Sequence, residues 1–203
     1  MKKVIALVVS LFLTCQTFYA VAEESTLSNF SIEEIRVGDR ADDHFTGREL
    51  MNAGRGGFDH LPQGTFYVHG FPKKEPVNDY DYSFEEYDYV EVITRADDKN
   101  LFYMEAVTGF IFFDDISDCY IKKDSIVKQM RSVFGPAKVE GPIVKINEDE
   151  PSGKSTYDRH DFFLDDGSAR VTCYDMDEAT GYSDAVIVEL FSLVADKWAP
   201  GKQ

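Results

Sequence analysis

Hydrophobic and polar residues alternate along six segments of the chain, and alternation with a period of two predicts β-strands. Glycine-containing or acidic turns separate neighbouring segments, as they do in antiparallel hairpins. The tightest of these turns is Asp-Asp-Gly at 165–167, which is typical of a two-residue hairpin loop. The strands that we expect are 65–69, 89–95, 101–107, 157–164, 169–175 and 185–193.

One segment, 124–136, repeats its apolar residues at helical spacing instead. Asp124 or Ser125 would cap its start, and Gly135-Pro136 would end it. The apolar stripe of this predicted helix consists of Ile126, Val127, Met130, Val133 and Phe134.

Two shorter helical segments are predicted nearer the N-terminus. The sequence SIEE at 31–34 matches a capping box in which Ser31 caps a short helix. Ile32 and Ile35 would then face the core, although the same letters also fit a strand. A second helical turn is expected around 50–51, before a group of glycines ends it.

The order of these elements predicts an α+β fold with a mainly antiparallel sheet. Hairpin strands come first, one clear helix follows, and a three-stranded C-terminal meander ends the chain, so we expect the helix to pack on one face of the sheet. Residues 139–154, between helix and meander, are expected to form a polar loop. In the middle strand of the meander, Ala169, Val171 and Cys173 share the face that we expect to be buried.

The run NDYDYSFEEYDYVEV at 78–92 alternates acids with aromatic rings and then loses its phase at Glu85-Glu86. A slip of phase predicts a bulge or a turn, so we expect a sheet edge where at least one ring is partly exposed. One interpretation is a strand with buried rings and solvated acids. The other is an exposed ridge that binds a basic partner through Asp79, Tyr80, Asp81 and Tyr82.

The N-terminus has the three parts of a bacterial-type secretory signal peptide. Two lysines precede an apolar run at 4–13, and the small residues of Ala-Val-Ala at 20–22 follow. The apolar run is shorter than the roughly 20 residues that a membrane-spanning helix needs. We therefore expect cleavage after Ala22, export to the periplasm or the medium, and one α+β domain over 23–203.

Export changes the interpretation of the three cysteines. Cys15 lies within the signal peptide, which leaves Cys119 and Cys173 in an oxidising compartment. An even number of cysteines there predicts a disulfide, and two unpaired buried thiols are the alternative.

The chain is strongly acidic, with 37 Asp and Glu against 21 Lys and Arg and a formal net charge of −16. Such a charge repels nucleic acids and anionic lipid surfaces and attracts cations and basic proteins. We accordingly expect a basic protein partner and no nucleic acid.

No motif for catalysis or for a cofactor is complete. The acidic turn DMDEATGYSD contains Asp175, Asp177 and Asp184, which could bind calcium, but its spacing departs from that of an EF-hand and a solvated hairpin is favoured. The letters GKS at 153–155 lack the glycine of a phosphate-binding loop, since Glu148 occupies its place. The histidines have no zinc-site spacing, and no serine lies in a G-x-S-x-G motif. The sequence thus predicts no cofactor, no metal and no catalytic residue.

The segment SGKSTY at 152–157 resembles the SGxxY loop of periplasmic lysozyme inhibitors, with one more residue between Gly153 and Tyr157. The resemblance covers six residues and implies a polar loop that contacts a basic enzyme through Ser152, Lys154 and Tyr157. We expect an exported acidic binding protein without a cofactor, of an inhibitor or immunity type. The alternatives are a carboxylate-based hydrolase and a structural envelope protein.

Overall fold

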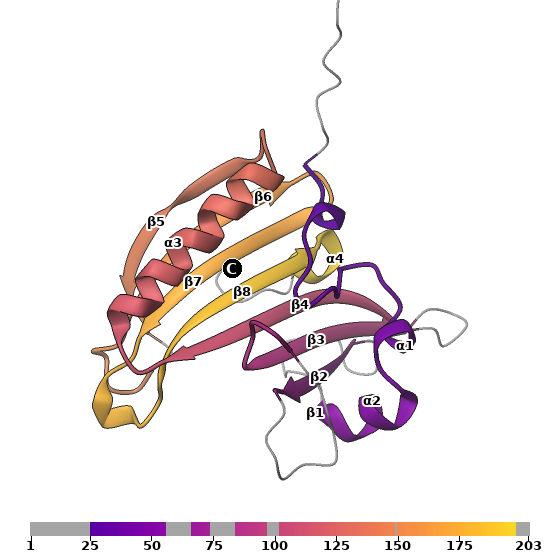
Figure 1. Ribbon diagram of the computed structural model, residues 1–203, viewed down its shortest axis with the longest axis horizontal. Helices are drawn as coiled ribbons and strands as arrows, with labels where there is room; N and C mark the ends of the chain where they lie inside the picture. Colours follow the sequence, from indigo (N-terminus) through magenta and orange to yellow (C-terminus); the bar gives the residue numbers. More distant parts are fainter. Residues whose placement is uncertain (1–24, 56–65, 74–83, 97–101, 149, 198–203) are drawn as a thin grey trace, which may run out of the picture.

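The chain folds around one antiparallel sheet of eight strands in the order β1-β2-β3-β4-β8-β7-β6-β5 (Figure 1). The computed structural model describes residues 25–55, 66–73, 84–96, 102–148 and 150–197. The strands are β1 (Gly54–Arg55), β2 (Phe66–Pro72), β3 (Tyr89–Ala96), β4 (Phe102–Phe113), β5 (Lys138–Ile146), β6 (Thr156–Leu164), β7 (Gly167–Asp175) and β8 (Asp184–Ser192). The helices are α1 (Ala41–His44), α2 (Gly47–Ala53), α3 (Ile116–Val133) and α4 (Leu193–Asp196), with 3₁₀ turns η1 (Leu27–Asn29) and η2 (Glu178–Thr180).

This architecture confirms the α+β class and the mainly antiparallel sheet. The helix α3 follows the hairpin strands β2 to β4 and precedes the meander β6-β7-β8, whose first hairpin turns at Asp165-Asp166. Only β5 breaks the expected order, because it follows α3 and forms the edge of the sheet beyond β6.

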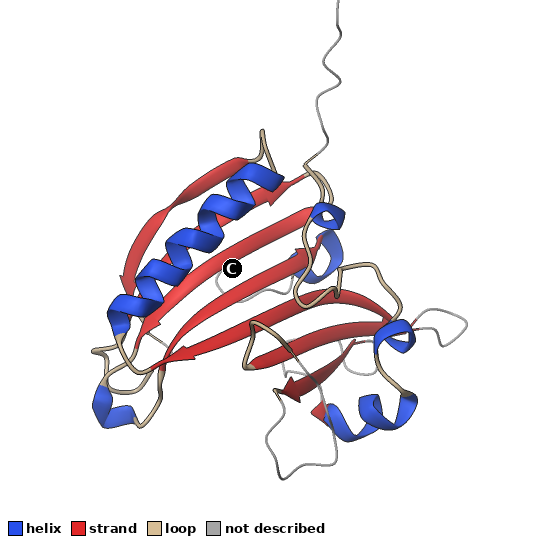
Figure 2. Cartoon of the chain, viewed as in Figure 1, coloured by secondary structure: helices blue, strands red, loops and turns tan. Residues whose placement is uncertain are grey.

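One face of the sheet, the covered face, carries the core. Figure 2 shows α3 lying along the strands on this face, where it packs on β7 and β8. Residues 25–45 pack on the same face beside α3, with η1 against β7 and α1 against β4. The buried cluster between these layers includes Ile32, Phe45, Val92, Val107, Met130, Val171 and Val188.

We call the other side of the sheet the open face. Of the described helices, only α4 lies on it, where Ala195 packs against Ala106 and Phe191. A hydrogen bond of 2.5 Å from Ser168 Oγ to Asp196 Oδ1 also ties α4 to this face. No other described helix covers the remainder of the open face.

The N-cap of helix α3 lies nine residues before the earlier of the two caps that the sequence predicted. The N-cap is Asp115, whose carboxylate accepts a 2.8 Å hydrogen bond from Ser117 N, so the expected cap at Asp124 or Ser125 is wrong. The predicted stripe of apolar residues does face the core. Its continuation towards the N-terminus runs through Lys123, which is buried, and a lysine at a core position conceals the helical pattern.

The predicted helix at 31–34 is also wrong. Ile32 and Ile35 instead pair across a tight turn, with hydrogen bonds of 3.1 and 2.9 Å between their backbones. The two residues of the turn, Glu33 and Glu34, have φ angles of 51° and 68°, the left-handed conformation of a type I′ turn. Both isoleucines are buried, so their expected place in the core is confirmed.

The side chain of Glu33 explains the phase slip in the acid–aromatic run. Its carboxylate accepts hydrogen bonds of 3.0, 2.7 and 3.0 Å from the backbone N–H groups of Glu85, Glu86 and Tyr87. Three successive N–H groups turned towards one anion form a bend rather than a strand. Phe84 and Tyr87 on the two sides of this bend are buried, so the phase slip marks the contact that holds the 32–35 turn on the sheet.

We predict that Glu33→Gln lowers the free energy of unfolding by about 1–3 kcal/mol, because both carboxylate oxygens accept these bonds and a glutamine has only one, uncharged oxygen to accept them. Urea denaturation of the variant measures the loss. The matched control is Glu34→Gln in the same turn, whose side chain is exposed and which should change the free energy by less than about 0.5 kcal/mol. Equal effects of the two substitutions would contradict the role given to Glu33.

The polar loop expected over 139–154 is partly wrong. Residues Lys138–Ile146 form the edge strand β5, and only the turn that follows it is irregular. The pairing with β6 shifts between Glu140 and Ile143, where Gly141-Pro142 forms a bulge. Glycine and proline usually mark the end of a strand, but an edge strand tolerates both at a bulge.

The expected disulfide is confirmed. Cys119 of α3 and Cys173 of β7 are bonded, with their Cα atoms 5.9 Å apart, and both residues are fully buried. The bond therefore fastens the first half of α3 to the centre of the sheet.

Candidate functional site

The structure brings together some of the residues that the sequence singled out. Ser152 and Lys154 lie in the turn between β5 and β6, and Tyr157 lies at the start of β6 on the open face. The proposed ridge of Asp79, Tyr80, Asp81 and Tyr82 lies outside the described residues.

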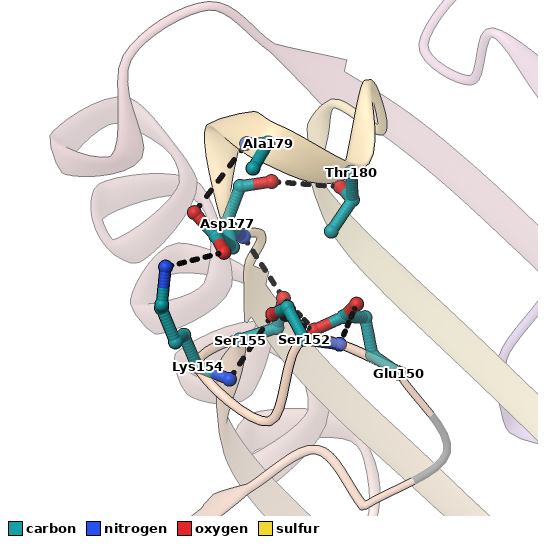
Figure 3. Close-up of polar contacts among 7 residues, drawn as sticks. All are labelled: Glu150, Ser152, Lys154, Ser155, Asp177, Ala179 and Thr180. Atoms are coloured by element: carbon teal, nitrogen blue, oxygen red, sulfur yellow. Dashed lines mark hydrogen bonds and ion pairs between the residues drawn. The ribbon is translucent and has the colours of Figure 1, made fainter.

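Residues 150–155, the 150–155 loop, are held in shape by one carboxylate (Figure 3). Glu150 is buried and accepts hydrogen bonds from Ser152 N at 2.6 Å, from the hydroxyl of Ser152 and from Ser155 Oγ at 3.0 Å. These bonds, first among them that from the Ser152 side chain, lower the pKa of Glu150. The loop is thus ordered around an ionised glutamate at neutral pH.

A second turn, residues 177–182, is joined to this loop (Figure 3). Asp177 N donates a 2.8 Å hydrogen bond to Ser155 Oγ, and Lys154 Nζ lies 3.4 Å from Asp177 Oδ2. The backbone oxygen of Asp177 accepts a 2.7 Å bond from Thr180 Oγ1, which closes the η2 turn. The loop and the turn therefore form one polar unit at the end of the sheet.

The outer surface of this unit is exposed. Ser152 and Gly153 are exposed, and the Lys154 side chain keeps 73% of its surface in solvent. In the 177–182 turn, Tyr182 is 67% exposed. The sequence analysis did not single out Tyr182; an aromatic residue within a polar, glycine-containing turn was the available signal.

The acidic residues considered for calcium have other partners. Asp177 pairs with Lys154, and Asp184 Oδ1 accepts a 2.8 Å hydrogen bond from Met176 N. Burial, and then the nearby Asp184, raise the pKa of Asp175. Across the described ranges, no three His, Cys, Asp or Glu side chains are grouped so that they could hold a metal ion.

The open face holds a charged network that the sequence analysis missed. Asp161, Arg170 and Glu189 face one another across β6, β7 and β8. Arg170 Nε donates a 2.9 Å hydrogen bond to Asp161 Oδ1, and its Nη1 lies 3.6 Å from Glu189 Oε2. Arg159 Nε lies 3.0 Å from Asp161 Oδ2. In a sequence, such residues at alternate positions resemble an ordinary solvated strand face.

Burial changes the protonation behaviour of this network. It raises the pKa of Glu189, against the opposing effect of Arg170. It also raises the pKa of Tyr174 to about 12, with Glu189 adding to the effect. The Tyr174 phenol consequently keeps its proton at neutral pH and is a hydrogen-bond donor on the open face.

On the covered face, a buried ion pair lies beneath α3. The ammonium of Lys123, a residue only 3% exposed, contacts Asp158 Oδ2 and lies 3.2 Å from Asp124 Oδ1. His160 lies on the same face of β6 as Asp158 and is also buried. Burial, and then the charge of Lys123, lower the pKa of His160.

We predict that acidification destabilises the protein partly through His160. Its pKa in the folded state lies below the ordinary value of about 6.5, so the unfolded chain binds the proton first as the pH falls. The free energy that the neutral ring contributes to folding is fully present above the pKa of the unfolded state. It is lost as the pH falls from there through the pKa of the folded state. The loss of unfolding free energy between pH 7.5 and 5.5 should therefore be smaller in His160→Gln than in the wild type.

The matched control for this prediction is His44→Gln, which replaces a histidine nearer the surface. It should keep the wild-type loss of stability over the same pH interval, measured by urea denaturation at both pH values. A His160→Gln protein with the same loss as wild type would show that His160 is not responsible.

Comparisons with protein-family models, with curated proteins and with solved structures found no match to this chain. Within the described part of the chain, none of the helices is both long enough and apolar enough to cross a membrane.

Proposed function

We propose that this chain is an exported acidic binding protein that presents the 150–155 loop and the 177–182 turn to a basic protein partner, as an inhibitor or immunity-type protein does. The observation that carries the proposal is the set of hydrogen bonds by which Glu150 fixes an otherwise exposed polar loop. Export is supported by the N-terminal signal pattern and by the Cys119–Cys173 bond, which suits an oxidising compartment.

A loop that is ordered before it binds loses little conformational entropy on binding. Ordering a flexible side chain at an interface costs about 0.5–1.5 kcal/mol, and Glu150 and Asp177 have already fixed the backbone around Ser152 and Lys154. The exposed residue Ser152 and the exposed ring of Tyr182 then supply contacts of the kind that interfaces favour.

Charge supports a basic partner. Lys154 is the one cation in the 150–155 loop, and its ammonium is paired with Asp177, whereas Glu148 and Glu178 at the borders of the unit are exposed. With a formal charge of −16 on the whole chain, a positively charged protein is attracted from a distance and a negatively charged one is repelled.

The test is capture of proteins from a bacterial envelope extract on the immobilised wild type and on two variants. Glu150→Ala releases the loop, and Tyr182→Ala removes the exposed ring. We expect a basic protein that is retained at about 0.05 M salt, released at about 0.5 M salt, and retained at least about fivefold less by each variant.

The control is Ile121→Ala, which truncates a residue 68% exposed on α3, away from the loop. It should retain as much of the same protein as wild type does. The proposal fails if the captured proteins are acidic or neutral, or if the Glu150 and Tyr182 variants retain them as well as the control does.

A further inference from the structure

The open face presents side chains in rows, because residues in register on neighbouring antiparallel strands point to the same side. One row, crossing β4, β8, β7 and β6, is Phe112, Ala185, Tyr174 and Tyr157. The next row is Phe110, Ile187, Thr172 and Arg159, and the one beyond it contains Glu189, Arg170 and Asp161. Polar residues on β6 and β7, and then on β8, therefore border the aromatic row.

The aromatic row forms a platform. Phe112 is 50% exposed, and Tyr174 and Tyr157 are partly exposed, with ring centroids 5.9 Å apart. The Arg159 guanidinium lies 5.6 Å from the centre of the Tyr157 ring. Since adjacent strands are about 4.8 Å apart, Phe112 and Tyr174 lie about 10 Å from each other across Ala185. An extended ligand built of successive rings could therefore stack on both aromatic side chains.

The polar rows contain groups whose hydrogen-bonding capacity is unused. The hydroxyl of Thr172, a residue with no solvent exposure, has no hydrogen-bond partner among the described residues. Arg159 Nε is buried and close to Asp161, yet it lacks the alignment of a hydrogen bond to any described group. Buried polar atoms without partners are rare in folded proteins and indicate a missing ligand or ordered water.

The charges of the network determine which ligand suits it. Two arginines face two carboxylates, so the cluster is neutral within a chain of charge −16. An anion would be repelled by the chain, and a cation would compete with Arg170 for Asp161 and Glu189. An uncharged ligand with many hydroxyl groups both donates to the carboxylates and accepts from Arg159 and the Tyr174 phenol.

We propose that the open face binds an uncharged saccharide chain lying across β4, β8, β7 and β6. The apolar faces of successive sugar rings stack on Phe112 and on the Tyr174–Tyr157 pair, and the hydroxyl groups reach the partly exposed Arg159, Glu189 and Tyr174 phenol. This site begins two residues beyond the 150–155 loop but uses other side chains, and it does not depend on the protein-binding function proposed above.

The test uses three uncharged hexasaccharides as probes, namely cellohexaose, maltohexaose and the hexamer of N-acetylglucosamine. Each is titrated to about 10 mM into the ¹⁵N-labelled protein, and amide chemical shifts are followed by NMR. This method still detects weak binding with dissociation constants in the millimolar range. We expect at least one probe to shift amides of β6, β7 and β8 in a saturable manner.

Two variants report on the two halves of the site. Arg159→Gln removes the guanidinium that lies beside the Tyr157 ring, and Phe112→Ala removes the most exposed ring of the platform. Each should weaken the affinity for the hexasaccharide about fivefold or more. Ile121→Ala on the covered side should bind it as the wild type does. Phe112 is exposed, so its variant remains informative if the Arg159 variant folds poorly.

The proposal is overturned if none of the three probes causes saturable shifts, if the shifts lie outside the open face, or if both site variants bind as tightly as Ile121→Ala. Protection of the open face by a captured protein, with no response to any hexasaccharide, would assign the face to a protein partner instead.

Discussion

Loss of the Cys119–Cys173 disulfide is expected to lower the free energy of unfolding by about 4 kcal/mol. The two cysteines are 54 residues apart in the sequence, and closing a loop of that length restricts the unfolded chain far more than the folded one. Urea denaturation of the wild type and of the Cys119→Ala, Cys173→Ala double variant measures the difference. A change this large is a substantial part of the stability of a typical domain.

A single Cys173→Ala variant is the control, because it breaks the same bond and should lose nearly as much stability as the double variant. Thiol titration of the denatured, unreduced wild type provides the independent check. Two reactive thiols in that titration would show that the bond is not formed and would remove the reason for the loss.

Substitution of Asp158 should have the second large effect. In Asp158→Ala the ammonium of Lys123 stays beneath α3 without its carboxylate, and stranding one member of a buried ion pair costs about 3–5 kcal/mol. Exposed Asp124 remains 3.2 Å away, which places the expected loss nearer the lower value. Chemical denaturation at pH 7 measures the change.

The exposed pair Lys138–Glu140 supplies the matched control. Its members keep 71% and 48% of their side-chain surface in solvent, so Glu140→Ala should cost less than about 1 kcal/mol. A double variant, Lys123→Met with Asp158→Leu, should recover most of the stability lost in Asp158→Ala, because no charge is then left buried. Failure of the double variant to recover any stability would show that Asp158 acts through packing rather than charge.

The strands with unbroken alternation were predictable because each depends on its own residues. Strands β6, β7 and β8 have one face against α3 and the core, so period two survives in the sequence. Prediction failed where a local signal was overruled by distant contacts. Lys123 occupies a core position only because Asp158 lies opposite, and the turn at Glu33 is held by backbone groups more than fifty residues away.

The candidate site likewise has one part that the sequence predicted and one part that it did not. Ser152 and Lys154 are neighbours in sequence, so a polar loop could be predicted around them. The ordered conformation of this loop could not be predicted, because it depends on a hydrogen bond between Ser155 and Asp177, which lie 22 residues apart in the sequence. The network on the open face depends on the register of three strands, which fixes Asp161, Arg170 and Glu189 side by side. Register follows from the folded sheet and cannot be deduced from alternation alone.

The bulge at Gly141-Pro142 has a consequence for how copies of this chain meet one another. A sheet of this kind has two outer strands whose unpaired backbone groups invite a neighbouring chain to add on, which is the first step of fibrous aggregation. Here one outer strand, β1, is only two residues long, and the other, β5, is interrupted at its middle by a residue without an N–H group. Val144 and Ile146, which are exposed on β5, therefore lie on a template too short to recruit a long strand. Both described edges of the sheet are therefore poor templates for the addition of a further strand.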